Sequence, residues 1–177
     1  MAGDEHLRLF CALTLPGAVV DGIARWQARE LRGGRVVPAA NLHVTLAFLG
    51  RRPAGDLPLV AGALREAAGG AAGLRLRLDR YREGRSVGML TFDDAGGRAT
   101  ALAEALQEAL GRLGLYRREQ RPWLPHVTVL RFRDRPRLHP ALPDLPEVVP
   151  SDAAVFISRL RPAGAEYESV ETVALGG

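Results

Sequence analysis

Two short runs of the chain carry the same three residues in the same order. His-Val-Thr occurs at His43–Thr45 and again at His126–Thr128. Both runs lie in apolar stretches typical of strands, and side chains two positions apart on a strand share a face. Each strand is therefore expected to present one imidazole and one hydroxyl to the same space. The same alternation predicts that Val44, Leu46 and Phe48 point the opposite way, into a core.

Two imidazoles that face one space can divide acid and base work between them. Imidazole has an ordinary pKa of about 6.5, so one ring can accept a proton from water while the other donates one to a departing oxygen. This is the work needed to open a cyclic phosphate, with His43 and His126 as the catalytic pair. Thr45 and Thr128 could donate hydrogen bonds to the non-bridging phosphate oxygens. Such chemistry requires no metal, and we expect neither a metal nor another cofactor.

A single histidine on a strand is more often a hydrogen-bonded structural residue than a catalyst. Here two of the four histidines lie in matching tripeptides on matching predicted strands, and this repetition favours a shared site. The other two, His6 and His139, have no counterpart in a repeat, and we expect both on the surface.

The elements that must position these residues repeat along the chain. Strand, helix and motif-bearing strand are predicted at 7–15, 18–31 and 42–49, and again at 85–92, 97–113 and 123–132. Further elements are a helix at 58–68, a strand from 74, and strands at 153–161 and 167–175 after a Pro-rich connection. We therefore expect one two-lobed domain over 1–177, with repeats at roughly 7–82 and 85–161. Packed about a pseudo-twofold axis, these halves would bring their equivalent strands together.

Composition excludes several other chemistries. The chain has 177 residues, a net charge of +4 and one cysteine, Cys11, so a disulfide within the chain and a cysteine-based zinc cluster are excluded. All 24 basic residues are arginine, which excludes a ligase that forms a lysine–adenylate intermediate. Arginine suits phosphate contacts. Asp93 and Asp94 precede the second long helix and are expected to cap it rather than bind metal.

No apolar segment is long enough to span a bilayer, and Asp4 and Glu5 stand where a signal peptide would carry positive charge. We expect a cytoplasmic monomer with no membrane or protein partner.

The motifs and their flanks resemble the two-histidine phosphoesterase superfamily. Within it they resemble the family named 2'-5' RNA ligase or RNA 2',3'-cyclic phosphodiesterase, whose mark is a pair of His-x-Thr-x motifs. The matching stretches are 8–10, 42–50, 125–131, 158–162 and 167–168. The resemblance implies a bilobal, duplicated α+β fold. In it, two mainly antiparallel sheets are related by a pseudo-twofold axis, with helices on the outside and a central cleft.

The resemblance also implies an activity. Members hydrolyse the 2',3'-cyclic phosphate of RNA ends or nucleotides to a 2'-phosphate without a metal. By analogy His43 would protonate the departing 3' oxygen and His126 would activate water, although the residues by themselves leave these roles open.

Two residues outside the motifs are further candidates for substrate binding. Phe10 could stack on the terminal base, although a place in the core is equally compatible with its surroundings. Arg131 resembles the arginine that follows the second motif in relatives and could contact phosphate. Simple alternation puts Arg131 on the opposite face from His126, so it would need a β-bulge or a strong twist to reach the site.

Three other functions remain open from the sequence. The same groups could run the reaction backwards and join RNA ends through a 2'-5' bond. The protein could bind RNA ends without catalysis, or it could cut internal phosphodiesters as a ribonuclease. The Arg-rich stretches 75–85 and 131–137 could bind RNA or could be solvated faces.

Overall fold

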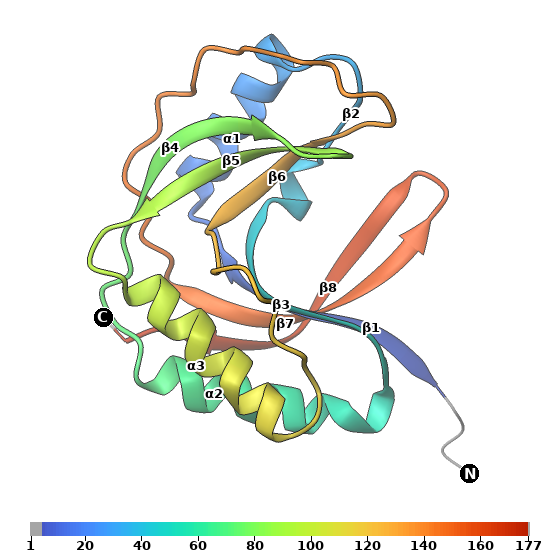
Figure 1. The fold of residues 1–177 in the computed structure, drawn as a ribbon, viewed down its shortest axis with the longest axis vertical. Coiled ribbons are helices and arrows are strands. Elements are labelled where there is room, and N and C mark those ends of the chain that lie inside the picture. Colours follow the sequence, from blue (N-terminus) through green and yellow to red (C-terminus); the bar gives the residue numbers. More distant parts are fainter. Residues whose placement is uncertain (1–4, 177) are drawn as a thin grey trace.

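The computed structural model describes residues 5–176. They form two four-stranded antiparallel sheets with helices on their outer faces (Figure 1). The elements are β1 (His6–Thr14), α1 (Gly17–Glu30), β2 (Arg35–Val36), β3 (His43–Pro53), α2 (Leu57–Gly69), β4 (Leu76–Glu83), β5 (Val87–Asp94), α3 (Arg98–Arg112), β6 (His126–Arg131), β7 (Asp152–Arg161) and β8 (Gly164–Ala174), with short 3-10 turns at Ala39–Asn41 and Ala54–Asp56. The predicted α+β class with two antiparallel sheets is confirmed.

Each sheet contains the two strands of one predicted strand–helix–strand repeat. The first has the order β3-β1-β7-β8 and the second β2-β6-β5-β4. The repeats are therefore β1-α1-β3 and β5-α3-β6. The strand predicted at 123–132 is wrong at its start, because β6 begins only at His126. Pro122 and Pro125 precede it, and proline has no N–H to donate to a strand ladder.

Each repeat places its long helix against the sheet of the other repeat (Figure 1). Helix α1 follows β1 of the first sheet, yet its Trp26 ring lies 6.1 Å from the Tyr81 ring on β4 of the second sheet. Helix α3 follows β5 of the second sheet, yet it packs beside α2 and against β3 of the first. The two halves are thus interlocked by their helices, an exchange that the sequence pattern does not predict.

Helix α3 docks through the apolar stripe that its periodicity predicts, whereas the buried face of α1 is rotated from the predicted stripe, of which only Ile23 is buried. The fully or nearly buried large apolar residues of the two helices are Val19, Ile23 and Trp26 on α1 and Leu102, Leu106 and Leu110 on α3. At the start of α3 the Asp94 carboxylate accepts hydrogen bonds from the backbone N–H of Ala99 at 3.3 Å and of Thr100 at 2.7 Å. The capping role predicted for Asp94 is confirmed, whereas Asp93 is simply exposed.

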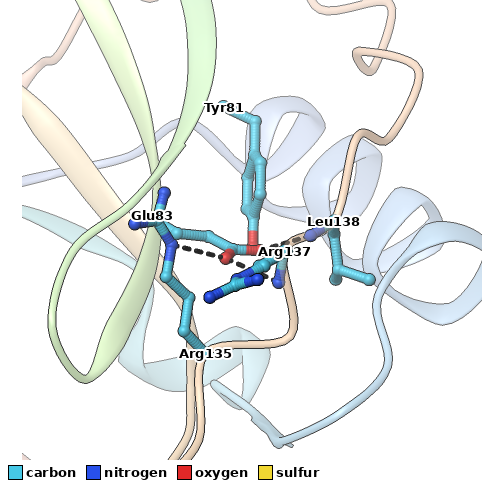
Figure 2. Close-up of polar contacts among 5 residues, drawn as sticks. All are labelled: Tyr81, Glu83, Arg135, Arg137 and Leu138. Carbon is cyan, nitrogen blue, oxygen red and sulfur yellow. Dashed lines mark hydrogen bonds and ion pairs between the residues drawn. The ribbon is translucent and has the colours of Figure 1, made fainter.

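The long connection between β6 and β7 is fastened to β4 by one carboxylate (Figure 2). The Glu83 side chain, only 3% exposed, accepts hydrogen bonds from the backbone N–H of Arg137 at 2.9 Å and of Leu138 at 2.7 Å. The Tyr81 hydroxyl and the Arg135 guanidinium also donate to it. Burial alone would raise the pKa of Glu83, but these four donors outweigh it and hold the pKa below its usual value. Glu83 therefore fixes a segment that has little secondary structure of its own.

Within residues 5–176 no helix has both the length and the apolar character needed to cross a membrane.

Candidate active site

The two His-Val-Thr runs begin β3 and β6, one in each sheet. On both strands the histidine and the threonine are half-buried while the valine between them is fully buried. The predicted alternation within each tripeptide is therefore correct. The two strands are also connected directly, because the indole N–H of Trp123, just before β6, donates to the backbone carbonyl of Thr45 at 3.0 Å.

Each motif histidine is oriented by the same hydrogen bond. Nδ1 of His43 lies 2.8 Å from the carbonyl oxygen of Asn41, and Nδ1 of His126 lies 2.8 Å from that of Leu124. Because a carbonyl oxygen only accepts, Nδ1 carries the hydrogen and donates in both rings. Nε2 of each ring is left for proton transfer. In the first motif it lies 2.9 Å from Oγ1 of Thr45, which can donate to it when the ring is neutral.

The surroundings of His43 favour its neutral form. Its ring lies against Phe10 and Tyr167, with ring centroids 4.9 and 5.4 Å apart. Burial lowers the pKa of His43, the hydrogen bond to Asn41 raises it, and the charges of His126 and Arg131 lower it further, so that the net pKa lies below 6.5.

A cavity of about 350 Å³ opens between the two sheets at the motifs. Five of the six predicted site residues line it, namely Phe10, His43, Thr45, Thr128 and Arg131. The sixth, His126, is not among the lining residues but lies two positions before Thr128 on the same strand face. The lining also includes Arg8, Arg35 and Arg161, so that, among the described residues, four arginines and no aspartate or glutamate surround the space. The arrangement favours an anionic ligand.

A β-bulge brings Arg131 to this cavity. The register between β5 and β6 skips Val129, the residue directly after Thr128. A bulge shifts the alternation by one, so Val129 and Leu130 are both buried and Arg131 returns to the face of the motif. The expectation that Arg131 needs a bulge to reach the site is met.

A matching bulge in β3 corrects the prediction for Phe48. The register between β1 and β3 skips Leu46, so Leu46 and Ala47 are both buried. Phe48 consequently lines the cavity and is 48% exposed, with the guanidinium of Arg8 4.8 Å from its ring centre. The prediction that Phe48 points into a core is wrong, because simple alternation does not count the bulge.

Phe10 belongs mainly to an aromatic cluster. Only 3% exposed, it stacks on Phe156 with centroids 5.1 Å apart and meets the edge of Tyr167 at 4.9 Å. Its packing against His43 favours a role in supporting the imidazole ring. Stacking of a base on Phe10 stays a prediction.

Several cavity residues were not predicted from the sequence. Arg8, Arg161 and Tyr167 lie in stretches that carry the family resemblance, so a signal for them was present. Arg35 lies on the two-residue strand β2, directly opposite Arg131 on β6. Nothing local in the sequence marks Arg35, because only the folded chain brings it to the motifs.

The first Arg-rich stretch, 75–85, is partly engaged with carboxylates of the protein. Arg75 pairs with Glu147 at 3.1 Å and Arg80 with Asp79 at 2.9 Å, which favours a structural, solvated face there. In the stretch 131–137, Arg135 pairs with Glu83 at 3.3 Å, whereas Arg131 lines the cavity.

The single cysteine, Cys11, is a buried free thiol. Burial raises the pKa of Cys11 to about 12, which keeps the thiol protonated and unreactive at neutral pH. Over residues 5–176 no group of three or more His, Cys, Asp and Glu side chains is placed to hold a metal ion.

Comparisons with known proteins agree with this geometry. The sequence pattern of the 2'-5' RNA ligase superfamily matches residues 15–163. An RNA 2',3'-cyclic phosphodiesterase of Escherichia coli is 36% identical over 136 residues, which cover 72% of this chain and 73% of that protein. A protein of the same name from Thermus thermophilus is 32% identical over 182 aligned positions, covering 97% of this chain and 91% of its own.

Solved structures show the same fold. E. coli LigT in its apo form superposes with a TM-score of 0.83 at 27% identity, over 98% of this chain and 99% of LigT. LigT complexed with 3'-AMP gives a TM-score of 0.83 at 26% identity, over 97% of this chain and 99% of LigT. The protein TT0787 of T. thermophilus gives 0.81 at 30% identity, over 97% and 99%.

Proposed function

Because the chain belongs to the 2'-5' RNA ligase superfamily and is a phosphodiesterase, we propose that it hydrolyses the 2',3'-cyclic phosphate at an RNA end to a 2'-phosphate without a metal ion. One observation carries the proposal. His43, Thr45 and Thr128 line one cavity that also holds four arginines and, among the described residues, no carboxylate, and His126 lies two positions before Thr128 on β6. The names of the two curated relatives supply the substrate class.

Binding would place the cyclic phosphate between the motifs. The hydroxyls of Thr45 and Thr128 donate hydrogen bonds to its non-bridging oxygens, and Arg131 adds a charged contact. Because contacts from both strands hold the phosphate, the phosphorus is in line with the attacking water on one side and the leaving oxygen on the other. This alignment lowers the entropic part of the activation free energy of hydrolysis.

The two Nε2 atoms would then move the protons. Water attacks the phosphorus and passes a proton to one imidazole, while the bond from phosphorus to the 3' oxygen breaks and that oxygen takes a proton from the other imidazole. The products are a 2'-phosphate and a free 3' hydroxyl. Each turnover exchanges the protonation of the rings, and solvent restores it. The family resemblance assigns the acid to His43 and the base to His126. The lowered pKa of His43 favours the opposite order in the free protein, but an anionic phosphate bound beside the ring favours its protonated form. We keep the family assignment as part of the proposal.

The test uses a short RNA with a 2',3'-cyclic phosphate end, incubated with the protein in EDTA. Phosphorus NMR identifies the product. We expect a 2'-phosphate from the wild type, formed at least about 10²-fold more slowly by His43→Ala and His126→Ala. The exposed His139, outside the cavity, provides the matched control His139→Ala, which should retain full activity. A 3'-phosphate product, or activity lost in EDTA and restored by a metal ion, would contradict the proposal.

Ligation is a second candidate because the matched superfamily is described as 2'-5' RNA ligase. The same groups would act in reverse, with the 5' hydroxyl of a second RNA end in place of water. Adding such an end at increasing concentration should raise the joined product in proportion, while hydrolysis dominates in dilute solution. An RNA bound without turnover would instead favour a non-catalytic module. Cytoplasmic location and a monomeric state stay predictions.

A further inference from the structure

Two glutamines are almost completely buried, one on each exchanged helix. Gln27 on α1 is 2% exposed and Gln107 on α3 is 7% exposed. Burying an amide is costly unless it is hydrogen-bonded, so the acceptors indicate what each amide does. Nε2 of Gln27 donates to the carbonyls of Val37 at 3.0 Å and Val129 at 2.9 Å. Nε2 of Gln107 donates to the carbonyl of Leu46 at 2.8 Å.

The acceptors on the motif strands are equivalent. Val129 and Leu46 each follow the motif threonine directly, and each is the residue that the strand register skips. A bulge disrupts the regular ladder between two strands, and a buried carbonyl is stabilised by the hydrogen bonds that it accepts. The carbonyl of Val129 also accepts the backbone N–H of Val37 at 3.1 Å. In both strands a side-chain amide from a helix of the other repeat donates to the carbonyl of the bulged residue. The same device therefore occurs twice, at matching positions, with different neighbouring side chains.

Each bulge decides which side chain faces the cavity next. Without the bulge at Val129, alternation would turn Arg131 away from Thr128. Without the bulge at Leu46, alternation would turn Phe48 away from Thr45. In the folded protein both residues line the cavity. A glutamine of one half thus fixes the conformation on which a substrate contact of the other half depends.

We infer that Gln27 and Gln107 are positioning residues that hold the two bulges and so aim Arg131 and Phe48, respectively, at the bound nucleotide. The inference rests on the proposed function, since it concerns the same cavity. Neither glutamine touches the substrate. Gln27 acts through Val129 on Arg131, and Gln107 acts through Leu46 on Phe48.

The test is a crossed double-mutant cycle on kcat/KM for a cyclic-phosphate RNA. Arg131→Ala and Phe48→Leu are each made in wild type, in Gln27→Met and in Gln107→Met. Methionine keeps the side-chain length and removes the amide. We expect Arg131→Ala to cost at least about tenfold in wild type and in Gln107→Met, but less than about threefold in Gln27→Met. The cost of Phe48→Leu should disappear only in Gln107→Met.

Each glutamine is therefore the control for the other, and the exposed Gln120→Met should leave both costs unchanged. A merely structural role would lower stability without this crossed pattern. Equal costs of Arg131→Ala in all backgrounds, or of Phe48→Leu in all backgrounds, would overturn the inference.

A second pair of variants covers the case in which methionine prevents folding. Glutamate can donate to the same carbonyl only while protonated. The cost of Arg131→Ala, normalised to wild type at each pH, should therefore fall between pH 6 and 9 in Gln27→Glu and stay constant in Gln107→Glu. A constant cost in both variants would refute the role of Gln27.

Crystal structures of the glutamine variants show whether each bulge is present, and this result does not depend on enzymatic turnover. Failure of the inference can therefore be distinguished from failure of the proposed function. Bulges that persist at both Val129 and Leu46 after loss of the amides would overturn the inference even if the enzyme is active. Bulges that are lost would support it even if no substrate is turned over.

Discussion

The strands β3 and β6 follow one plan up to the bulge and differ after it. Both begin with a histidine whose Nδ1 donates to a carbonyl two residues earlier, and both continue with a threonine and a bulged residue. Beyond the bulge, β3 presents Phe48 and β6 presents Arg131. Duplication thus supplies two equivalently oriented imidazoles, while the positions after them are free to differ in chemistry.

The environments of the two rings differ as well. His43 packs against Phe10 and Tyr167, and burial lowers its pKa. His126 enters the second sheet beside the exposed Leu124. Burial favours the neutral form of His43 in the free protein, whereas an anionic phosphate beside the ring would favour the protonated form that a general acid needs.

The largest expected effect tests whether the two motifs are equal partners. His43→Ala and His126→Ala should each lower kcat by about 10² to 10⁴-fold, the usual worth of a general acid or base. The double variant should be scarcely worse than either single one, because the groups act as a unit. Rapid-quench assays measure all three. A variant with near-normal kcat would show that its motif is not catalytic.

The next effect concerns the residues after the bulges. Arg131→Ala should lower kcat/KM by about 10- to 100-fold, since a charged hydrogen bond contributes about 1.5–3 kcal/mol. Phe48→Leu should cost less than about tenfold, because leucine keeps part of the apolar contact with a base. Steady-state assays on one RNA give both values. A larger loss of kcat/KM for Phe48→Leu than for Arg131→Ala would contradict the expectation that the residue after the bulge in β6 contributes more to substrate binding than the one in β3.

The two glutamines can be compared through stability. Gln27→Met and Gln107→Met should each lower the free energy of unfolding by about 1–3 kcal/mol, because a buried carbonyl loses a donor. The loss should be greater at Gln27, whose amide donates to two carbonyls rather than one. Urea denaturation measures it, with the exposed Gln120→Met as the control. Unchanged stability at both sites would mean that water replaces the amides.

The smallest effect is a shift in pH dependence. The pKa of His43 lies below 6.5, so the pair reaches its singly protonated form below that pH, and the acid limb of log kcat/KM should have its midpoint below 6.5. Arg131→Ala removes a positive charge that lowers this pKa, so the midpoint should move to higher pH. Proton NMR titration of the imidazole follows the same change directly. A midpoint that stays in place would exclude electrostatic coupling between Arg131 and His43.

Much of the site could be predicted because its information is local. The type and spacing of His43, Thr45, His126 and Thr128 and the period-two rule of strands were enough to identify them. Arg131 was found only with the condition that a bulge intervene. Phe48 was misplaced, because a bulge leaves no mark in an apolar run such as 46–49.

The sequence by itself determined the doubled motif, the order of the main strands and helices, the apolar stripe of α3, and the chemistry open to two imidazoles and two hydroxyls. Only the tertiary structure decided which sheet each helix covers, where the strand alternation breaks, and which arginines reach the cavity. The physical reason is the range of the interactions. Periodicity and residue type act between neighbours along the chain. The bulges at Leu46 and Val129, by contrast, depend on amides 61 and 102 positions away, and the lowered pKa of His43 depends on burial by the whole fold.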